Sequence, residues 1–194
     1  MRLYTRFSFE TLSNTYLIGP DEGGDAVLFD PSSFDVPLLD LIEAQGYYVR
    51  SVVLTHIDES HPSGLRTLRR IYDCTVYGSH ADVLGSPAVN VADGDVLEIC
   101  NEPVRAIAMP GHGSDSIAYY VDGFVFTGAA MSAGEHGPVP SPYAKELLLK
   151  NIRDRICTLP SETVILPFVG PPSTVAVEKR TFSSEPPPPI AGLP

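Results

Sequence analysis

The sequence has few positive charges. Thirteen Lys and Arg residues stand against 24 Asp and Glu residues, which gives a net charge of −11 at neutral pH. Nucleic-acid phosphates require a basic face, so this balance argues against a nucleic-acid partner. Long apolar runs are also missing. No stretch approaches the roughly 18–20 uninterrupted apolar residues that a membrane helix needs, and no membrane partner is expected.

Cysteines are few and widely spaced. Cys74, Cys100 and Cys157 are odd in number and form no Cys-x-x-Cys pair, which is typical of buried, reduced cysteines in a cytoplasmic protein. Residues 1–6 carry two positive charges with no apolar stretch behind them, so we expect no signal peptide. Together these features predict a cytoplasmic location.

The composition is that of an ordinary globular domain. The chain has 194 residues, of which 43% are hydrophobic and 19% are charged, enough for one domain with its own core. We place this domain at residues 1–182. Residues 183–194 include four consecutive prolines, which neither enter a helix nor donate to a sheet, and predict an extended or disordered tail. A PxxP-type ligand is the alternative interpretation of this tail.

Strand-like and helix-like periodicities alternate along residues 1–182. Strands are expected at residues 15–19, 26–30, 49–54, 74–77, 96–99, 104–108, 116–121, 123–127 and 163–166. Helices are expected at residues 34–45, 63–72, 80–84 and 143–159. No GxGxxG follows the first strand and no GxxxxGK[ST] occurs, which argues against a doubly wound nucleotide binder. The order favours an α/β protein with two sheets face to face and helices outside, a four-layer αββα sandwich.

Histidines follow two of the expected strands. His56 and His61 come directly after strand 49–54, in the segment Thr-His-Ile-Asp-Glu-Ser-His. His112 follows strand 104–108, in Pro-Gly-His-Gly-Ser. Strand ends and Gly-rich loops are where a rigid scaffold offers side chains to a ligand, so these residues are candidates for a functional site.

These motifs resemble those of the metallo-β-lactamase superfamily, in particular its glyoxalase II-like (hydroxyacylglutathione hydrolase-like) branch. The segment Thr-His-x-x-x-x-His followed by Pro-Ser-Gly-Leu is similar to the family's His-x-His-x-Asp-His motif and the helix behind it. Further matches follow in the same order as in the family, and the resemblance covers about residues 3–182. They are NTYLI (14–18), FDP (29–31), PGHGS (110–114), GFVFTG (123–128), VILP (164–167), GPPST (170–174) and EKRT (178–181).

The resemblance implies a two-metal site, from which this sequence departs. His56, His61 and His112 match family ligands. At the other ligand positions, Asp58 replaces a histidine, Ser60 and Ala129 replace aspartates, the second of which bridges the metals, and Val169 replaces the last histidine.

The losses fall mainly on the family's second metal. By resemblance, the first metal position retains His56, Asp58 and His112, and two imidazoles with one carboxylate are an accepted ligand set for Zn²⁺ and non-haem Fe²⁺. The second position retains His61 alone. We therefore expect one divalent metal, Zn or Fe, or none. The alternative is a vestigial cluster, held by hydrogen bonds from Asp58 to a histidine without metal.

The resemblance implies a metal-dependent hydrolase that acts on a thioester or ester-like bond of a small-molecule substrate. A mononuclear or weakened site would make its catalysis weak or specialised. The alternative is a non-catalytic pseudoenzyme that binds a small ligand or partner in the same cleft. The sequence does not indicate the oligomeric state.

Other polar residues admit less specific interpretations. Ser60 is either a hydroxyl near the reacting centre or a turn or cap residue. Ser114 to Ser116 suggest a polar turn. A Ser-His-Asp hydrolase is the alternative interpretation, although the sequence has no Gly-x-Ser-x-Gly elbow. Glu135 and His136 are either replacement ligands or a solvated loop. His80 is expected on the surface, and Glu59 is expected to face away from Asp58.

Overall fold

The computed structural model describes residues 1–57, 62–83 and 85–183, of which residues 62 and 63 are described by their backbone alone. Within these residues most strands form two six-stranded sheets, and two further pairs of strands form short hairpins. The first contains, in spatial order, β1 (Arg2–Ser8), β2 (Ser13–Gly19), β3 (Gly24–Phe29), β4 (Tyr47–Val53), β5 (Thr75–Gly78) and β8 (Val89–Asn90). The second contains β16 (Ser173–Thr174), β15 (Val164–Pro167), β12 (Phe124–Gly128), β11 (Ile117–Val121), β10 (Glu102–Ala108) and β9 (Val96–Ile99).

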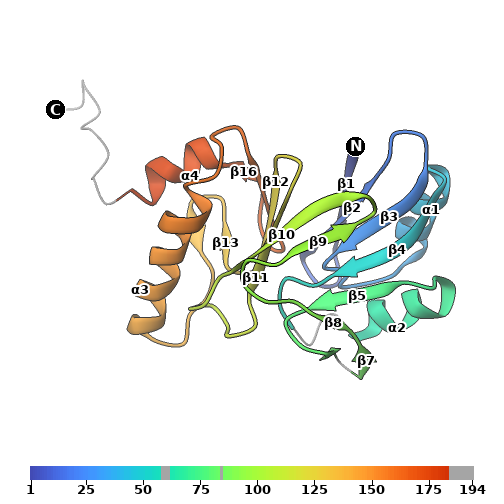
Figure 1. Ribbon diagram of the computed structural model, residues 1–194, viewed down its shortest axis with the longest axis horizontal. Helices are drawn as coiled ribbons and strands as arrows, with labels where there is room; N and C mark the ends of the chain where they lie inside the picture. Colours follow the sequence, from blue (N-terminus) through green and yellow to red (C-terminus); the bar gives the residue numbers. More distant parts are fainter. Residues whose placement is uncertain (58–61, 84, 184–194) are drawn as a thin grey trace.

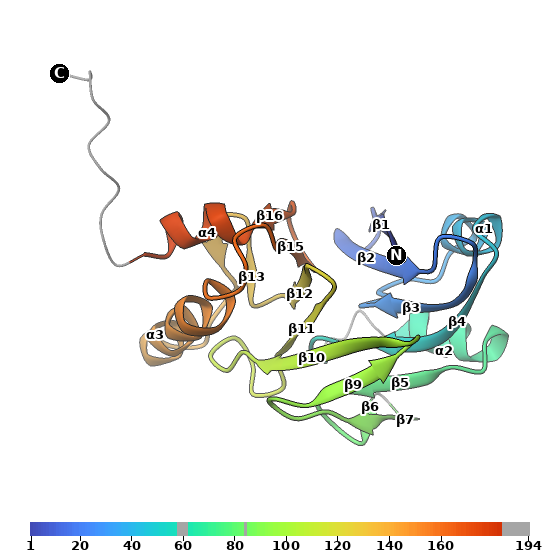
Figure 2. The ribbon, with the colours of Figure 1, turned by 45° about the horizontal axis from the view of Figure 1, so that its top comes forward.

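The two sheets pack face to face with helices on their outer faces (Figures 1 and 2). Helices α1 (Val36–Ala44) and α2 (Pro62–Ile71) cover the first sheet. Helix α3 (Pro142–Asn151), the π-helical turn η1 (Ile152–Ile156) and α4 (Val175–Thr181) cover the second. The predicted αββα sandwich is confirmed.

Side-chain alternation explains why both faces of each sheet are buried. In β3, Val27 and Phe29 face the other sheet, whereas Ala26 and Leu28 face the helices, because successive strand residues point to opposite faces. Phe29 stacks on Phe126 of the second sheet at a centroid distance of 3.7 Å. These contacts set the relative position of the sheets, and with it the position of the loops at their edges.

Strand direction brings several loops to one edge of the sandwich. Strands β3, β4 and β5 run parallel, so the segments that follow them emerge on the same side. In the second sheet β12 and β15 are also parallel. The backbone amide of Ile117 donates to Thr55 O at 2.8 Å, which joins the end of β4 to the start of β11. The candidate functional residues lie at this edge.

The structure corrects one expected element and adds others. Residues 80–84 were expected to be helical, but β6 (Asp82–Val83) pairs with β7 (Ser86–Pro87). The Asp82 carboxylate accepts from the amide of Gly85, which has a φ of 77° and closes a turn. Leu84 lies outside the described residues. Strand β1, helix α4 and the short hairpin of β13 (Met131–Ser132) and β14 (Glu135–His136) were not predicted.

The sequence also led to expectations for the cysteines, for membrane-spanning helices and for the C-terminal tail. All three cysteines are free, but Cys74 and Cys100 are only half-buried. Burial raises the pKa of each thiol.

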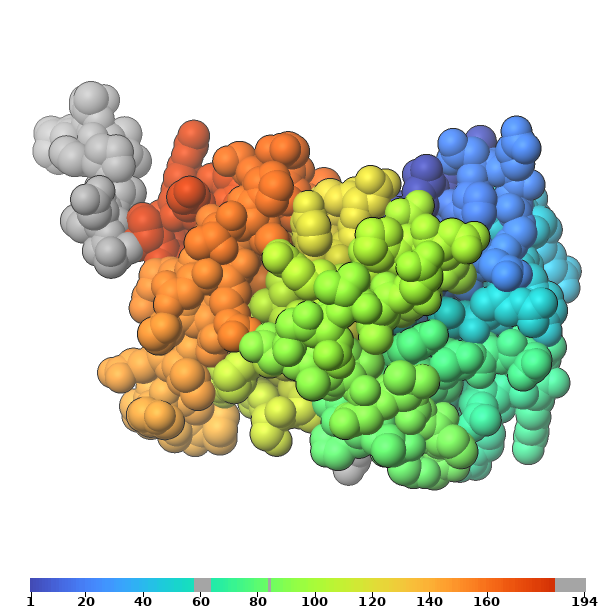
Figure 3. Space-filling view, in the orientation of Figure 1, coloured from blue at the N-terminus to red at the C-terminus, as the bar shows by residue number. Residues whose placement is uncertain are grey.

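No helix in the described part of the chain is long and apolar enough to cross a membrane. The proposed tail from residue 184 onward lies outside the described residues, so its conformation stays a prediction. In the surface view, the helices of the second sheet form one flank of the molecule and the first sheet lies on the other (Figure 3).

Candidate metal and substrate site

Two of the predicted ligands meet at the strand edge. His56 follows β4 and is buried, whereas His112 lies in the loop after β10 and is half-buried. Their ring centroids are 6.1 Å apart, with an interplanar angle of 69°. The Phe168 ring, just beyond β15, lies 5.0 Å from the His56 ring. The structure thus brings together the two histidines that the sequence placed on separate strands.

A buried hydrogen-bond relay orients His56. Asp30, directly after β3, accepts from the Thr55 amide and from the Thr55 hydroxyl, each at 2.8 Å. Because the hydroxyl hydrogen points to Asp30, the 2.8 Å contact between Thr55 Oγ1 and His56 Nδ1 must be donated by the imidazole. In a neutral ring, Nε2 therefore carries the lone pair, which is the atom that a metal would use.

His112 is oriented in the same way. Its Nδ1 lies 2.7 Å from the carbonyl oxygen of Pro138, which can only accept. In the neutral ring Nε2 again carries the lone pair. Helix α3 supports this loop closely: a Cβ on Gly111 would meet Ala144 O at 2.6 Å, and Asn151 Nδ2 donates to Pro110 O at 3.2 Å. Both histidines therefore use Nδ1 as a structural donor.

Asp115 connects the two histidine loops. Its Oδ2 accepts from the backbone amide of Ile57 at 2.7 Å, so the residue after His56 is tied to the segment that carries His112. The sequence suggested only a polar turn here. The contact makes Asp115 a positioning residue, because it sets the separation of the two loops.

Two buried tyrosines hold the strand ends around the site. Tyr16 donates to Pro167 O at 2.6 Å, and Tyr119 donates to Leu54 O at 3.3 Å. The pKa of both phenols is raised, mainly by burial and to a smaller extent by the nearby charge of Asp30. Both hydroxyls therefore stay protonated near neutral pH and remain donors.

A cleft of about 350 Å³ opens beside His112. Ala129 and Val169, which the motif resemblance assigns to metal-ligand positions of the family, both line it, as that assignment predicts. Asp58, Ser60 and His61 lie outside the described residues, and their predicted roles stay predictions. In the described part of the chain, no group of three or more His, Cys, Asp or Glu side chains could hold a metal ion.

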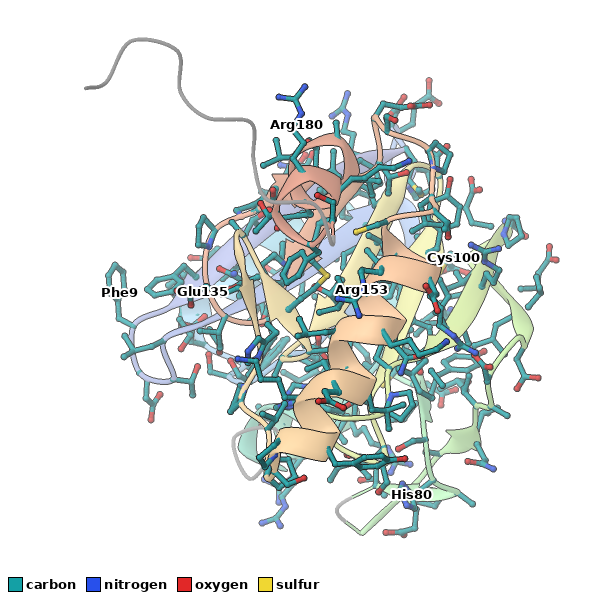
Figure 4. The ribbon with its side chains drawn as sticks, turned by 90° about the vertical axis from the view of Figure 1, so that its left-hand side faces the viewer. Phe9, His80, Cys100, Glu135, Arg153 and Arg180 are labelled. Atoms are coloured by element: carbon teal, nitrogen blue, oxygen red, sulfur yellow. The ribbon has the colours of Figure 1, made fainter. Side chains whose placement is uncertain are left out.

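The β13–β14 hairpin forms another wall of the cleft. Glu135 is exposed and His136 is half-buried, and both line the same cleft as His112. The buried carboxylate of Glu178 accepts from the Gly134 amide through both oxygens, at 3.0 and 3.1 Å, and so anchors the hairpin. These residues are therefore part of the cleft wall and remain accessible to solvent, and a role as replacement ligands stays a prediction. His80 is exposed, as predicted, and lies away from Glu135 in Figure 4.

Sequence reasoning missed the three positioning residues Asp30, Thr55 and Asp115. Asp30 and Thr55 are polar residues that stand at the ends of apolar expected strands. This position at a strand end was the sequence signal that could have identified them as site residues. Their roles depend on contacts between segments far apart in the chain. Periodicity within one segment carries no information on such contacts.

We expect Thr55→Val to weaken both the fold and the orientation of His56. Valine keeps the shape but removes the hydroxyl, which leaves Asp30 Oδ2 and His56 Nδ1 without this buried partner at a cost of about 1–3 kcal/mol. If a metal is bound, its affinity should fall by roughly 10–100-fold, as with other lost outer-shell contacts. Denaturant unfolding and metal titration measure the two effects. Thr55→Ser, which keeps the hydroxyl, is the matched control, and equal stability of the two variants would contradict the relay.

Comparison with known proteins places the chain in a family. A model of the metallo-beta-lactamase superfamily matches residues 9–182. The chain belongs to this superfamily. A hydroxyacylglutathione hydrolase from Yersinia pestis (strain Pestoides F) is 34% identical over 141 residues, which cover 72% of this chain and 55% of the relative. The chain spans about half the length of the curated relatives it matches.

Solved structures agree with this assignment. ETHE1 from Myxococcus xanthus has a TM-score of 0.83 and 28% identity, over 94% of this chain and 83% of that one. TTHA1623, solved in a di-iron-bound form, has a TM-score of 0.75 and 25% identity, over 92% of this chain and 98% of that one. The glyoxalase II-like resemblance seen in the motifs is therefore supported by curated relatives and by the fold.

Proposed function

We propose that the chain is a metal-dependent hydrolase that cleaves a thioester or another ester-like bond in a small molecule. One divalent ion, Zn²⁺ or Fe²⁺, would be held by His56, Asp58 and His112. The observation that carries this proposal is the shared orientation of the two histidines. Each donates through Nδ1, so each keeps the lone pair on Nε2.

The residues fit one ion better than two. Two imidazoles and a carboxylate suit Zn²⁺ or Fe²⁺, and Asp58 is the carboxylate nearest to His56 in the sequence. For a second ion, Ser60, Ala129 and Val169 offer at best a weak hydroxyl, so His61 would stand almost alone. One imidazole does not compensate an ion for the loss of its hydration shell.

A divalent ion in this position supplies polarisation of the substrate carbonyl and lowers the pKa of a coordinated water. The chain's own residues position the reaction. Asp30 and Thr55 hold His56, Asp115 ties its loop to that of His112, and the Phe168 ring excludes water from one side of His56. The cleft beside His112 offers room for the substrate.

The test is metal content together with activity. We expect elemental analysis of untagged protein, purified without chelator, to give one ion per chain. Asp58→Ala should abolish binding, whereas His61→Ala should leave it largely intact. Hydrolysis of a simple acyl thioester should rise with metal loading across these variants.

Two results would refute the proposal. One is a second ion at full occupancy, and the other is undiminished hydrolysis after the metal has been removed. A protein that binds no metal and hydrolyses no thioester, yet binds a small molecule in the cleft, would instead support the non-catalytic alternative.

A further inference from the structure

The part of the cleft where the family's metal ligands are missing has an apolar lining. Ala129, Met131, Phe168 and Val169 contribute to its wall, next to His112. Phe168 also contacts the His56 ring. The apolar wall therefore adjoins His112 within the cleft and adjoins the His56 ring through Phe168.

Val169 is held in a defined position. Asn14 binds the backbone on both sides of Val169. The backbone amide of Asn14 donates to Phe168 O at 2.7 Å, and its side-chain Nδ2 donates to Gly170 O at 2.8 Å. The Val169 side chain is nevertheless 51% exposed. A loop that is fixed by hydrogen bonds and presents an apolar side chain to the cleft has the properties of a preformed contact surface.

Two exposed apolar residues lie in the turn between β1 and β2, close in sequence to Asn14. Leu12 lies two residues before Asn14 and is mostly exposed, and Phe9 is 82% exposed with its ring packed edge-on against Phe7 at 5.3 Å. Phe9 and Glu135 project on the same side of the molecule (Figure 4). An exposed aromatic residue therefore lies on the side of the molecule that carries the cleft residue Glu135.

We propose that this apolar wall, formed by Ala129, Met131, Phe168 and Val169, binds the aliphatic acyl group of the substrate. The substrate class is then a thioester or ester of a medium-length, uncharged acyl chain. This inference rests on the proposed hydrolase function. It places the acyl carbonyl beside His56 and His112 and the acyl chain where relatives would hold a second ion.

The charge of the molecule favours an uncharged occupant. The exposed Glu135 carboxylate lines the cleft, and the chain as a whole carries a net charge of −11. An anionic group would be repelled from this part of the surface. An aliphatic chain gains from burial against Val169 and Phe168 without such a cost.

The first experiment measures binding without catalysis. Neutral, unreactive S-alkyl thioethers of N-acetylcysteamine, with alkyl chains of four, six and eight carbons, are titrated against the protein by calorimetry. We expect affinity to rise by up to about fourfold for each added methylene, which corresponds to about 0.8 kcal/mol. A flat series would overturn the proposal.

Val169→Asp is the informative variant, and Val177→Asp is its matched control. Val177 lies on α4 outside the cleft lining and is 54% exposed, close to the exposure of Val169. We expect the chain-length dependence to disappear in Val169→Asp and to persist in Val177→Asp. Equal loss in both variants would assign the effect to charge alone and overturn the subsite.

The second experiment uses the corresponding acyl thioesters and compares kcat/KM along the same chain lengths. Chain-dependent binding without hydrolysis would retain the subsite and refute the hydrolase. Hydrolysis with no chain dependence in either assay would retain the hydrolase and refute the subsite. Sedimentation of the wild type and of Val169→Asp at the titration concentration completes the test. A wild-type dimer that becomes a monomer in Val169→Asp would show that a second copy of the chain occupies this surface instead.

Discussion

Gly128→Ala should lower the free energy of unfolding by about 3 kcal/mol and disrupt the histidine pair. Gly128 ends β12 with a φ of 58°, a left-handed conformation that costs an alanine about 1–2 kcal/mol. The added Cβ would also meet Thr55 Oγ1 at 2.2 Å. Thr55 must then move, and its displacement breaks the buried hydrogen bonds to Asp30 and His56 at a further cost of about 1–3 kcal/mol. Denaturant unfolding measures the loss.

Gly123→Ala separates the two contributions. Gly123 precedes the same strand with a φ of 79°, but no atom lies within 4 Å of the position of its Cβ. This variant should lose only the conformational part, about 1 kcal/mol. If Gly128→Ala were no less stable than Gly123→Ala, the close approach of β12 to Thr55 would not have the energetic role assigned to it.

Restoring the missing ligands should create a second metal site. The triple variant Ser60→Asp, Ala129→Asp and Val169→His is expected to raise the metal content from one ion per chain to two. Ala129 and Val169 line the same cleft as His112, so the new carboxylate and imidazole would enter it. Elemental analysis after metal saturation measures the change, with circular dichroism as the check on folding.

A control triple variant tests whether position matters. It carries Ser60→Asp and Ala129→Asp with Val177→His in place of Val169→His, so the added charges and imidazole are the same in number. We expect no second ion at full occupancy in this control. A correctly folded restored variant that still holds one ion would argue against the assignment of positions 129 and 169 to the family's ligands. If two ions do bind, the chain-length preference for aliphatic thioethers should also decline, since Val169 would be gone.

The order of motifs was sufficient to predict the fold. The order of strands and helices favoured two sheets face to face, and the resemblance of the motifs to the metallo-β-lactamase superfamily implied that His56 and His112 converge. The structure has this arrangement. The expected helix at 80–84 was wrong because the Asp82 to Gly85 turn closes a hairpin there. Turn chemistry of this kind outweighs weak helical periodicity over a short segment.

The orientation of the histidines required knowledge of contacts between distant segments. His56 Nδ1 faces Thr55, whose hydroxyl donates to Asp30 just after β3, and His112 Nδ1 faces the Pro138 carbonyl beyond β14. No spacing rule predicts which ring nitrogen will be used in this way. The Asp115 contact with the Ile57 amide was equally invisible in the sequence.

Composition and the order of the elements were therefore sufficient to predict an acidic αββα protein with histidines at its strand ends, and the family resemblance of the motifs predicts that Ser60, Ala129 and Val169 stand at three ligand positions. These properties belong to residue types and to their spacing along the chain, so they can be read without coordinates. The tertiary structure decided the tautomers of His56 and His112. It further decided that the Val169 side chain is exposed while its neighbouring backbone is held by Asn14. It also decided that an apolar wall adjoins the imidazoles, because each of these depends on hydrogen bonds and contacts between segments that only the folded chain brings together.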